Sequence, residues 1–168
     1  LLMSATPIPR TLKLALSDFK GLSLLSSPPV FKRPTKTFVD VFSKKTIKRV
    51  VFFEVSRGGQ VLFINNNIKT MDKVVSLIKK LLPFVSVDFI HGKENSFDLE
   101  QKMDLFINKK IDVLVASTIV ECGINIPSVN SIIINDSHLF GVSQLYQMRG
   151  RVGRSSSSSF AYLFVPQK

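Results

Sequence analysis

Short runs of apolar residues recur along the chain, and stretches with helical periodicity separate them. The runs at 60–64, 85–90, 111–116, 131–135 and 160–165 are rich in β-branched residues and too short for typical helices. Continuous apolar runs of this kind predict strands that are buried on both faces of a sheet. A further β-rich segment at 37–42 predicts one more strand ahead of them.

The segments between these runs predict helices. Segment 68–82 repeats its apolar residues with the 3.6-residue period of an amphipathic helix, and 97–107 also gathers apolar residues on one face. Two further helices are expected. One begins at Ser43 and is closed by Gly58-Gly59, and a short one spans 144–150.

Buried strands that alternate with amphipathic helices are typical of βαβ units. We therefore expect an α/β fold with a mainly parallel sheet, helices on both faces and right-handed crossovers. In such sheets, ligands bind beyond the carboxyl ends of the strands. The polar segments that directly follow predicted strands are therefore the first candidates for a functional site.

The first 36 residues show a different pattern. Residues 1–27 predict the end of a strand, a proline-punctuated turn, a short helix ended by Gly21 and another apolar strand. Residues 28–36, rich in proline and basic residues, predict a stiff linker. We assign 1–36 to a lead-in segment and 37–168 to the main domain. Because the chain begins with Leu-Leu-Met inside a predicted strand, we expect it to be part of a longer protein.

Composition narrows the possible classes of protein. The hydrophobic fraction is 45%, which argues against intrinsic disorder, and the 168 residues suit one domain. No apolar run approaches the roughly 18 residues of a membrane-spanning helix, so we expect no membrane segment. One cysteine excludes a disulfide framework, and two distant histidines make a metal site unexpected.

The net charge of +11 is concentrated at the two ends of the chain. Residues 1–57 carry 11 basic and three acidic side chains, and residues 141–168 carry four basic and none acidic. The middle, 58–140, is nearly balanced, with eight basic and nine acidic. This excess indicates a polyanionic partner. Ordinary solvated surface lysines remain the alternative, because 16 of the 23 basic residues are lysine.

The strongest candidate segment is Gln147-Met148-Arg149-Gly150-Arg151-Val152-Gly153-Arg154. Arg151 and Arg154 are spaced to lie near one face of a helix, and a guanidinium group can bind phosphate oxygens in bidentate fashion. Gly150 and Gly153 permit sharp turns and close approach of the backbone to a ligand. Positive charge at a terminal phosphate accelerates phosphoryl transfer by ~10³–10⁵. A basic surface turn without a specific ligand is the alternative.

Weaker candidates follow or precede other strands. Small hydroxyl groups at a strand end can donate to phosphates, and glycine or asparagine suits a loop that faces a nucleotide. An ordinary loop, turn or helix cap is the alternative for each of them. They are Ser117, Thr118, Gly123 and Asn125 in 117–127, Thr6 and Arg10 in 4–11, Asn65 in 65–67, and His91 with Gly92. Cys122 is interpreted as a packed small residue and 155–159 as a loop.

One expected part of a nucleotide site is missing from the sequence. It contains no Gly-x-x-x-x-Gly-Lys-[Ser/Thr] phosphate loop, and no Asp-Glu pair follows an apolar strand to hold magnesium. Arginines that are suited to bind phosphate, in a sequence that has no phosphate loop, indicate half of a nucleotide site. The other half must then come from elsewhere.

Taken in order, these segments resemble the second RecA-like motor domain of superfamily 2 helicases and translocases. Residues 4–11 resemble helicase motif III, 60–67 motif IV and 90–95 the short motif after it. Residues 117–127 resemble motif V and 147–154 motif VI. The string Thr-Pro-Ile-Pro-Arg-Thr narrows the resemblance to RecG and the transcription-repair coupling factors, and 58–61 and 140–146 are more similar to the coupling factors.

The resemblance implies a RecA-like three-layer αβα lobe and roles for individual residues. Arg151 and Arg154 would be arginine fingers for ATP bound with Mg²⁺ mainly on a missing first lobe, and Gln147 would couple ATP to DNA. Gly123 and Asn125 would face the nucleotide, although the family usually has aspartate at the position of Asn125. Thr118 would face the DNA backbone, and we group with it Ser117, Asn65, His91, Gly92, Arg10 and Thr6.

The same resemblance implies an ATP-driven translocase on double-stranded DNA in the bacterial cytoplasm. In coupling factors, other domains contact RNA polymerase and a nucleotide-excision repair protein to clear stalled polymerase and recruit repair. A RecG-like fork-remodelling lobe is the alternative within the group. Outside it, a basic module that binds nucleic acid without catalysis remains possible. Because the phosphate loop is absent, we expect this chain alone to be inactive.

Overall fold

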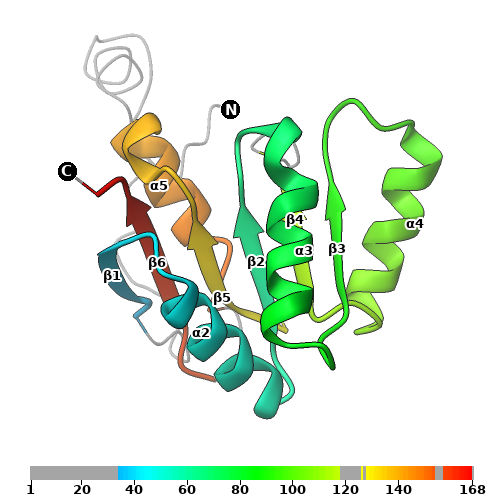
Figure 1. The fold of residues 1–168 in the computed structure, drawn as a ribbon, viewed down its shortest axis with the longest axis horizontal. Coiled ribbons are helices and arrows are strands. Elements are labelled where there is room, and N and C mark those ends of the chain that lie inside the picture. The colour runs from blue at the N-terminus through cyan, green and yellow to red at the C-terminus, as the bar shows by residue number, and fades with distance from the viewer. Residues whose placement is uncertain (1–33, 118–125, 127, 154–156, 168) are drawn as a thin grey trace, which may run out of the picture.

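Parallel strands form a single sheet in the computed structural model, which describes residues 34–117, 126, 128–153 and 157–167. The sheet has six strands in the order β1-β6-β5-β2-β4-β3 (Figure 1), and every neighbouring pair is parallel. The predicted α/β fold with a mainly parallel sheet is confirmed. The strands are β1 (Lys36–Val41), β2 (Gln60–Ile64), β3 (Val87–Ile90), β4 (Val113–Ala116), β5 (Val129–Ile134) and β6 (Phe160–Val165).

Helices cover both faces of this sheet and give three layers. Helices α2 (Lys44–Ser56) and α3 (Met71–Leu81) pack on one face, where Ile47, Val51 and Ile78 are fully buried. Helices α4 (Ser96–Ile107) and α5 (Val142–Arg149) pack on the other face through Phe106 and Met148. The sheet thus lies between two separate apolar clusters, which explains why its central strands are apolar on both sides.

Most element boundaries lie within two residues of those that the sequence predicts. Ser43 is the N-cap of α2, and its hydroxyl accepts a hydrogen bond from the Thr46 amide at 3.3 Å. Gly58 ends the following turn with φ +74°, a conformation that suits glycine. The expected helix 68–82 divides into a 3-10 turn, Ile68–Thr70, and α3, because the Asn67 side chain caps the turn.

Four further boundaries differ from the predictions by two residues, and one of them is the start of β3 at Val87 instead of 85. The strand expected at 111–116 begins only at Val113, because the Asp112 carboxylate accepts a hydrogen bond from the Ser86 amide at 2.8 Å and holds the entry loop. Strand β5 begins at Val129, two residues earlier than predicted, and α5 begins at Val142. The elements expected within 1–33 lie outside the described residues. The described helices include none that is both long and apolar enough to cross a membrane.

A buried ion pair connects α2 to the sheet. Glu54 is fully buried and accepts two hydrogen bonds from Arg57, at 3.1 and 2.7 Å. The Ser131 hydroxyl on β5 donates to the same carboxylate at 2.5 Å. Arg57 also donates to the Ser158 carbonyl at 2.7 Å, directly before β6. A β-carbon at Gly59 would lie 1.9 Å from a Glu54 oxygen, so glycine is required beside the pair.

Replacing Arg57 with methionine should destabilise the fold, because it leaves the Glu54 carboxylate buried without its cation. We expect a loss of about 3 kcal/mol in the free energy of unfolding, measured by urea denaturation. The double variant Glu54→Gln/Arg57→Met removes the stranded charge as well and should recover part of that loss. A double variant less stable than Arg57→Met would contradict this account.

Tyr162 on β6 should make stability depend on pH in the alkaline range. Burial raises the pKa of Tyr162 above its ordinary value of 10.0; Glu54 adds to this, and Arg49 and Arg57 oppose it. The neutral phenol is therefore favoured in the folded state, and its stabilisation is lost as pH rises above about 10. The unfolding free energy of the wild type should therefore fall relative to that of Tyr162→Phe from pH 9 to 11. A constant difference would refute this expectation.

Candidate functional site

Four polar residues form a row at the carboxyl edge of the sheet. Asn135, Asn65, Ser117 and His91 directly follow β5, β2, β4 and β3, which are neighbours in that order. Backbone hydrogen bonds of 2.9 to 3.2 Å extend the ladder to these residues. The amides of Asn135, Asn65 and Ser117 donate to the carbonyl groups of Ile64, Ala116 and Ile90, respectively. Three predicted site residues, Asn65, Ser117 and His91, are thus brought together at one edge.

Asn65 points into the protein. It is 1% exposed, and its side-chain amide donates to the Asn67 carbonyl and the Thr70 hydroxyl, both at 2.9 Å. Its side-chain oxygen accepts from Asn135 at 3.1 Å. These contacts hold the loop between β2 and α3. In the same loop, Asn67 caps the 3-10 turn, which agrees with the helix cap given as the alternative for segment 65–67. A direct DNA contact of Asn65 stays a prediction.

Ser117 and Arg151 line one pocket at this edge of the sheet. The pocket lies between residues of β2, β4 and β5 and residues of α4 and α5, and most of its wall is apolar. Ser117 and Arg151 carry the only polar side chains among its described lining residues. The Ser117 hydroxyl is buried, and within the described residues no group satisfies it. A hydroxyl and a guanidinium are both groups that can donate hydrogen bonds to the oxygens of an anion.

Helix α5 positions the arginine segment against the core. Met148 and Val152 are buried on either side of Gly150, where the helix ends, and the Arg151 amide donates to the Met148 carbonyl at 3.0 Å. Gly153 has φ +79°, and a β-carbon there would lie 2.3 Å from the Ser159 hydroxyl oxygen. Gly153 is therefore required by the turn after Arg151, whereas Gly150 has an ordinary helical backbone at the end of α5. Gln147 lies within α5.

Other predicted site residues are placed only in part. His91 and Gly92 form the loop after β3, where Gly92 is exposed. Thr6, Arg10, Thr118, Gly123, Asn125 and Arg154 lie outside the described residues, as does Cys122. The roles assigned to all of these residues stay predictions.

Sequence reasoning missed several polar residues that organise this edge. Asn135 was interpreted only as the end of a strand, yet it bonds both Asn65 and Asp136. Glu94 and Lys102 were not singled out, although they pair at 3.1 Å beside His91. The position of Asn135 after a triple-isoleucine run was a usable signal, because it places an amide at a strand end. Across the part of the chain that the structure describes, no three His, Cys, Asp or Glu side chains gather in a metal-binding group.

The chain is similar to known proteins in sequence and in fold. The helicase conserved C-terminal domain family matches residues 43–156. The transcription-repair-coupling factor of Buchnera aphidicola subsp. Baizongia pistaciae is 45% identical over 166 residues, which are 99% of this chain and 24% of that protein. The Escherichia coli K12 transcription-repair-coupling factor is 39% identical over 99% of this chain and 14% of its own length. The chain thus spans a quarter or less of these relatives.

A solved structure of RecG bound to a three-way DNA junction is also similar. It covers 99% of this chain and 23% of the RecG chain, with a TM-score of 0.81 and 29% identity. The predicted resemblance to the group of RecG and the coupling factors, and the RecA-like form of the lobe, are confirmed. Since the family match extends over most of its residues, the chain belongs to the helicase conserved C-terminal domain family.

Proposed function

We propose that this chain is the carboxyl-side motor lobe of an ATP-dependent double-stranded DNA translocase of the coupling-factor type. The observation that carries the proposal is the shared pocket of Ser117 and Arg151 at the carboxyl edge of the sheet. Parallel α/β sheets bind their ligands at this edge. Family membership supports a helicase lobe, and the similarity to coupling factors supports this branch.

The chemistry assigned to this lobe is electrostatic. The substrate, ATP with Mg²⁺, would bind mainly to a first lobe with a phosphate loop, which this sequence lacks. Arg151, together with Arg154, would then face the terminal phosphate across the gap between lobes. A guanidinium group placed there stabilises the charge that develops on the transferred phosphoryl oxygens. The Ser117 hydroxyl fits such a site because it is buried and unsatisfied within the described residues.

Movement along DNA would follow from differential contacts in the ATP and ADP states. Closure of the lobes brings the arginines to the phosphate, and opening after hydrolysis releases them. The loops after β2 and β3 and Ser117 after β4 lie at the same edge as Arg151, so one closure can move both nucleotide and DNA contacts. We assign the coupling to ATP to Gln147 on α5, to Gly150 and Gly153 after it, and to Gly123 and Asn125, whereas Thr118 is assigned to the DNA backbone.

Partners beyond DNA belong to the parent protein. We assign RNA polymerase and a nucleotide-excision repair protein to other domains of a coupling factor, acting in the bacterial cytoplasm. RecG-like fork remodelling is the second candidate, favoured by the TM-score of 0.81 to junction-bound RecG. Sequencing the region ahead of this lobe separates the two, because only a coupling factor carries a polymerase-interacting module there.

The isolated chain should hydrolyse essentially no ATP, with or without duplex DNA, because it holds only half of the site. The measurement is phosphate release by the purified fragment over a range of DNA concentrations. A control mixture with the separately produced first lobe tests whether activity returns. Strong turnover by the fragment alone would refute the half-site argument.

In the parent protein, Arg151→Ala should lower kcat for ATP hydrolysis by about 10³-fold or more, because it removes charge from the transition state. Binding of duplex DNA, measured by fluorescence anisotropy, should fall much less. Arg149→Ala is the matched control, since Arg149 lies over the Tyr146 ring with its guanidinium carbon 4.5 Å from the ring centre. Equal losses of hydrolysis and DNA binding in Arg151→Ala would exclude the finger role.

A further inference from the structure

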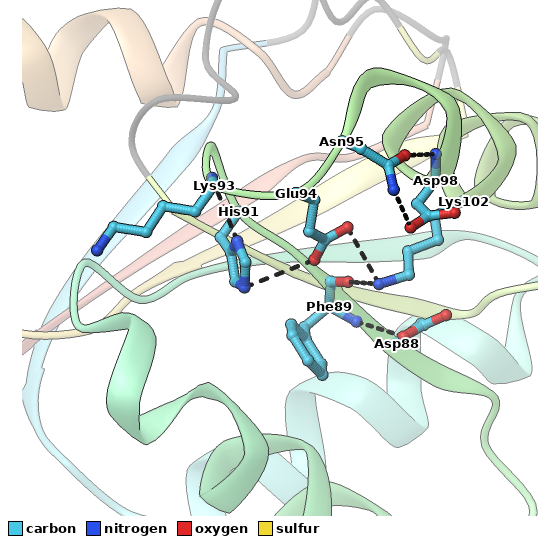
Figure 2. A network of polar contacts seen from close by, with 8 residues as sticks. All are labelled: Asp88, Phe89, His91, Lys93, Glu94, Asn95, Asp98 and Lys102. Atoms are coloured by element: carbon cyan, nitrogen blue, oxygen red, sulfur yellow. Dashed lines mark hydrogen bonds and ion pairs between the residues drawn. The ribbon is translucent and has the colours of Figure 1, made fainter.

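The loop after β3 is held by a network of polar contacts that joins three elements (Figure 2). Glu94 in the loop pairs with Lys102 on α4, with 3.1 Å between the carboxylate and the ammonium nitrogen. The same ammonium donates to the Phe89 carbonyl on β3 at 3.0 Å and lies 4.8 Å from the centre of the Phe89 ring. Lys102 therefore ties the strand, the loop and the helix together.

The other end of the loop is fixed as well. The Asn95 side chain accepts a hydrogen bond from the Asp98 amide at 2.8 Å and donates to the Asp98 carboxylate at 2.7 Å. This is an N-cap that starts α4. With Lys102 at one side and the cap at the other, the backbone between His91 and Asn95 has little freedom to move.

Both ring nitrogens of His91 are directed at the protein itself. Its Nδ1 accepts a hydrogen bond from the Lys93 amide at 3.3 Å, and its Nε2 lies 3.8 Å from Glu94 Oε1. The His91 side chain is 18% exposed and that of Glu94 is 11% exposed. A DNA phosphate that approached the imidazole would therefore meet the Glu94 carboxylate, which carries the same sign of charge. Such an approach is unfavourable at short range.

Lys93 has the opposite surroundings. Its backbone amide is fixed by His91, whereas its side chain is exposed and points away from the network in Figure 2. Within the described residues, its ammonium contacts no carboxylate or carbonyl group. The loop lies beside the end of β4, because the Ser117 amide donates to the carbonyl of Ile90. Lys93 thus presents a free cation at the edge that the proposed function assigns to DNA.

We infer that Lys93 is the phosphate-contacting residue of this loop, and that His91, Glu94 and Lys102 are positioning residues that hold it. The inference rests on the proposed function, since it names the DNA contact of the same edge. It reassigns the contact from His91, whose ring serves the backbone of Lys93. A lysine is well suited to the task because it contacts phosphate as a point charge without reading sequence.

The experiment measures duplex DNA binding by the full-length parent over a range of salt concentrations. Lys93→Ala should weaken binding and reduce the slope of log K against log salt by about 0.9, the value for one phosphate contact. Lys93→Arg should restore the slope. Lys80→Ala is the matched control, because Lys80 is an exposed lysine in the last turn of α3 and should leave the slope unchanged.

Variants of the positioning residues are tested by a measurement that general unfolding of the protein would not reproduce. Glu94→Gln and Lys102→Met should raise the DNA concentration for half-maximal ATPase while kcat at saturating DNA stays at the wild-type level. Their salt slope should also stay unchanged, since Lys93 remains. His91→Gln should also keep the wild-type salt slope, because the imidazole makes no phosphate contact in this account.

Two outcomes overturn the inference while leaving the proposed function intact: a Lys93→Ala variant with the wild-type slope, or a His91→Gln variant whose slope falls by about 0.9. A parent protein that binds duplex DNA without any salt dependence, or whose ATPase ignores DNA, would overturn both. Because the wild-type curve is measured in the same series, the two failures are distinguished directly.

Discussion

The burial of one parallel sheet on both faces is the constraint on which the rest of the lobe depends. The central strands β2, β4 and β5 consist almost wholly of buried residues, so their polar chemistry is displaced to the strand ends. Because all strands are parallel, their carboxyl ends meet at one edge. Asn135, Asn65, Ser117 and His91 occupy that edge in a row, joined by backbone hydrogen bonds that continue the ladder.

The arginine segment reaches this edge through packing rather than through sequence proximity. Met148 and Val152 are buried in the cluster that contains the ends of β2 and β4, and Arg151 lies between them in the chain. Gly153 then permits close contact with Ser159 ahead of β6. The backbone of Arg151 is therefore anchored to the core of the lobe by its buried neighbours in the chain. A motion of the whole lobe moves Arg151 and the strand-end loops together, which suits the proposed coupling.

Periodicity in the sequence was sufficient to predict the strands, the helices and the α/β fold, because buried strands and amphipathic helices have distinct repeats. It also predicted polar residues after the strands, and the structure brings three of them, Asn65, Ser117 and His91, to one edge of the sheet. It could not show the direction in which each polar side chain points. Asn65 and His91 both turn inward, and the ion pair of Glu54 with Arg57 depends on Ser131, 77 residues away from Glu54. Such contacts are set by tertiary packing, which a local pattern does not contain.

The positions of the charges clarify what the net charge of +11 means. Helix α2 carries the exposed residues Lys44, Lys45, Lys48 and Arg49, whereas α4 carries the exposed acidic residues Asp98, Glu100 and Asp104. The net charge alone therefore does not show where the functional site lies. The proposals made for this lobe rest instead on two individual cations: Arg151 at the pocket and Lys93 on its fixed loop. A phosphate contact differs from a solvated surface in the fixed position of its charged side chain, not in the number of charges nearby.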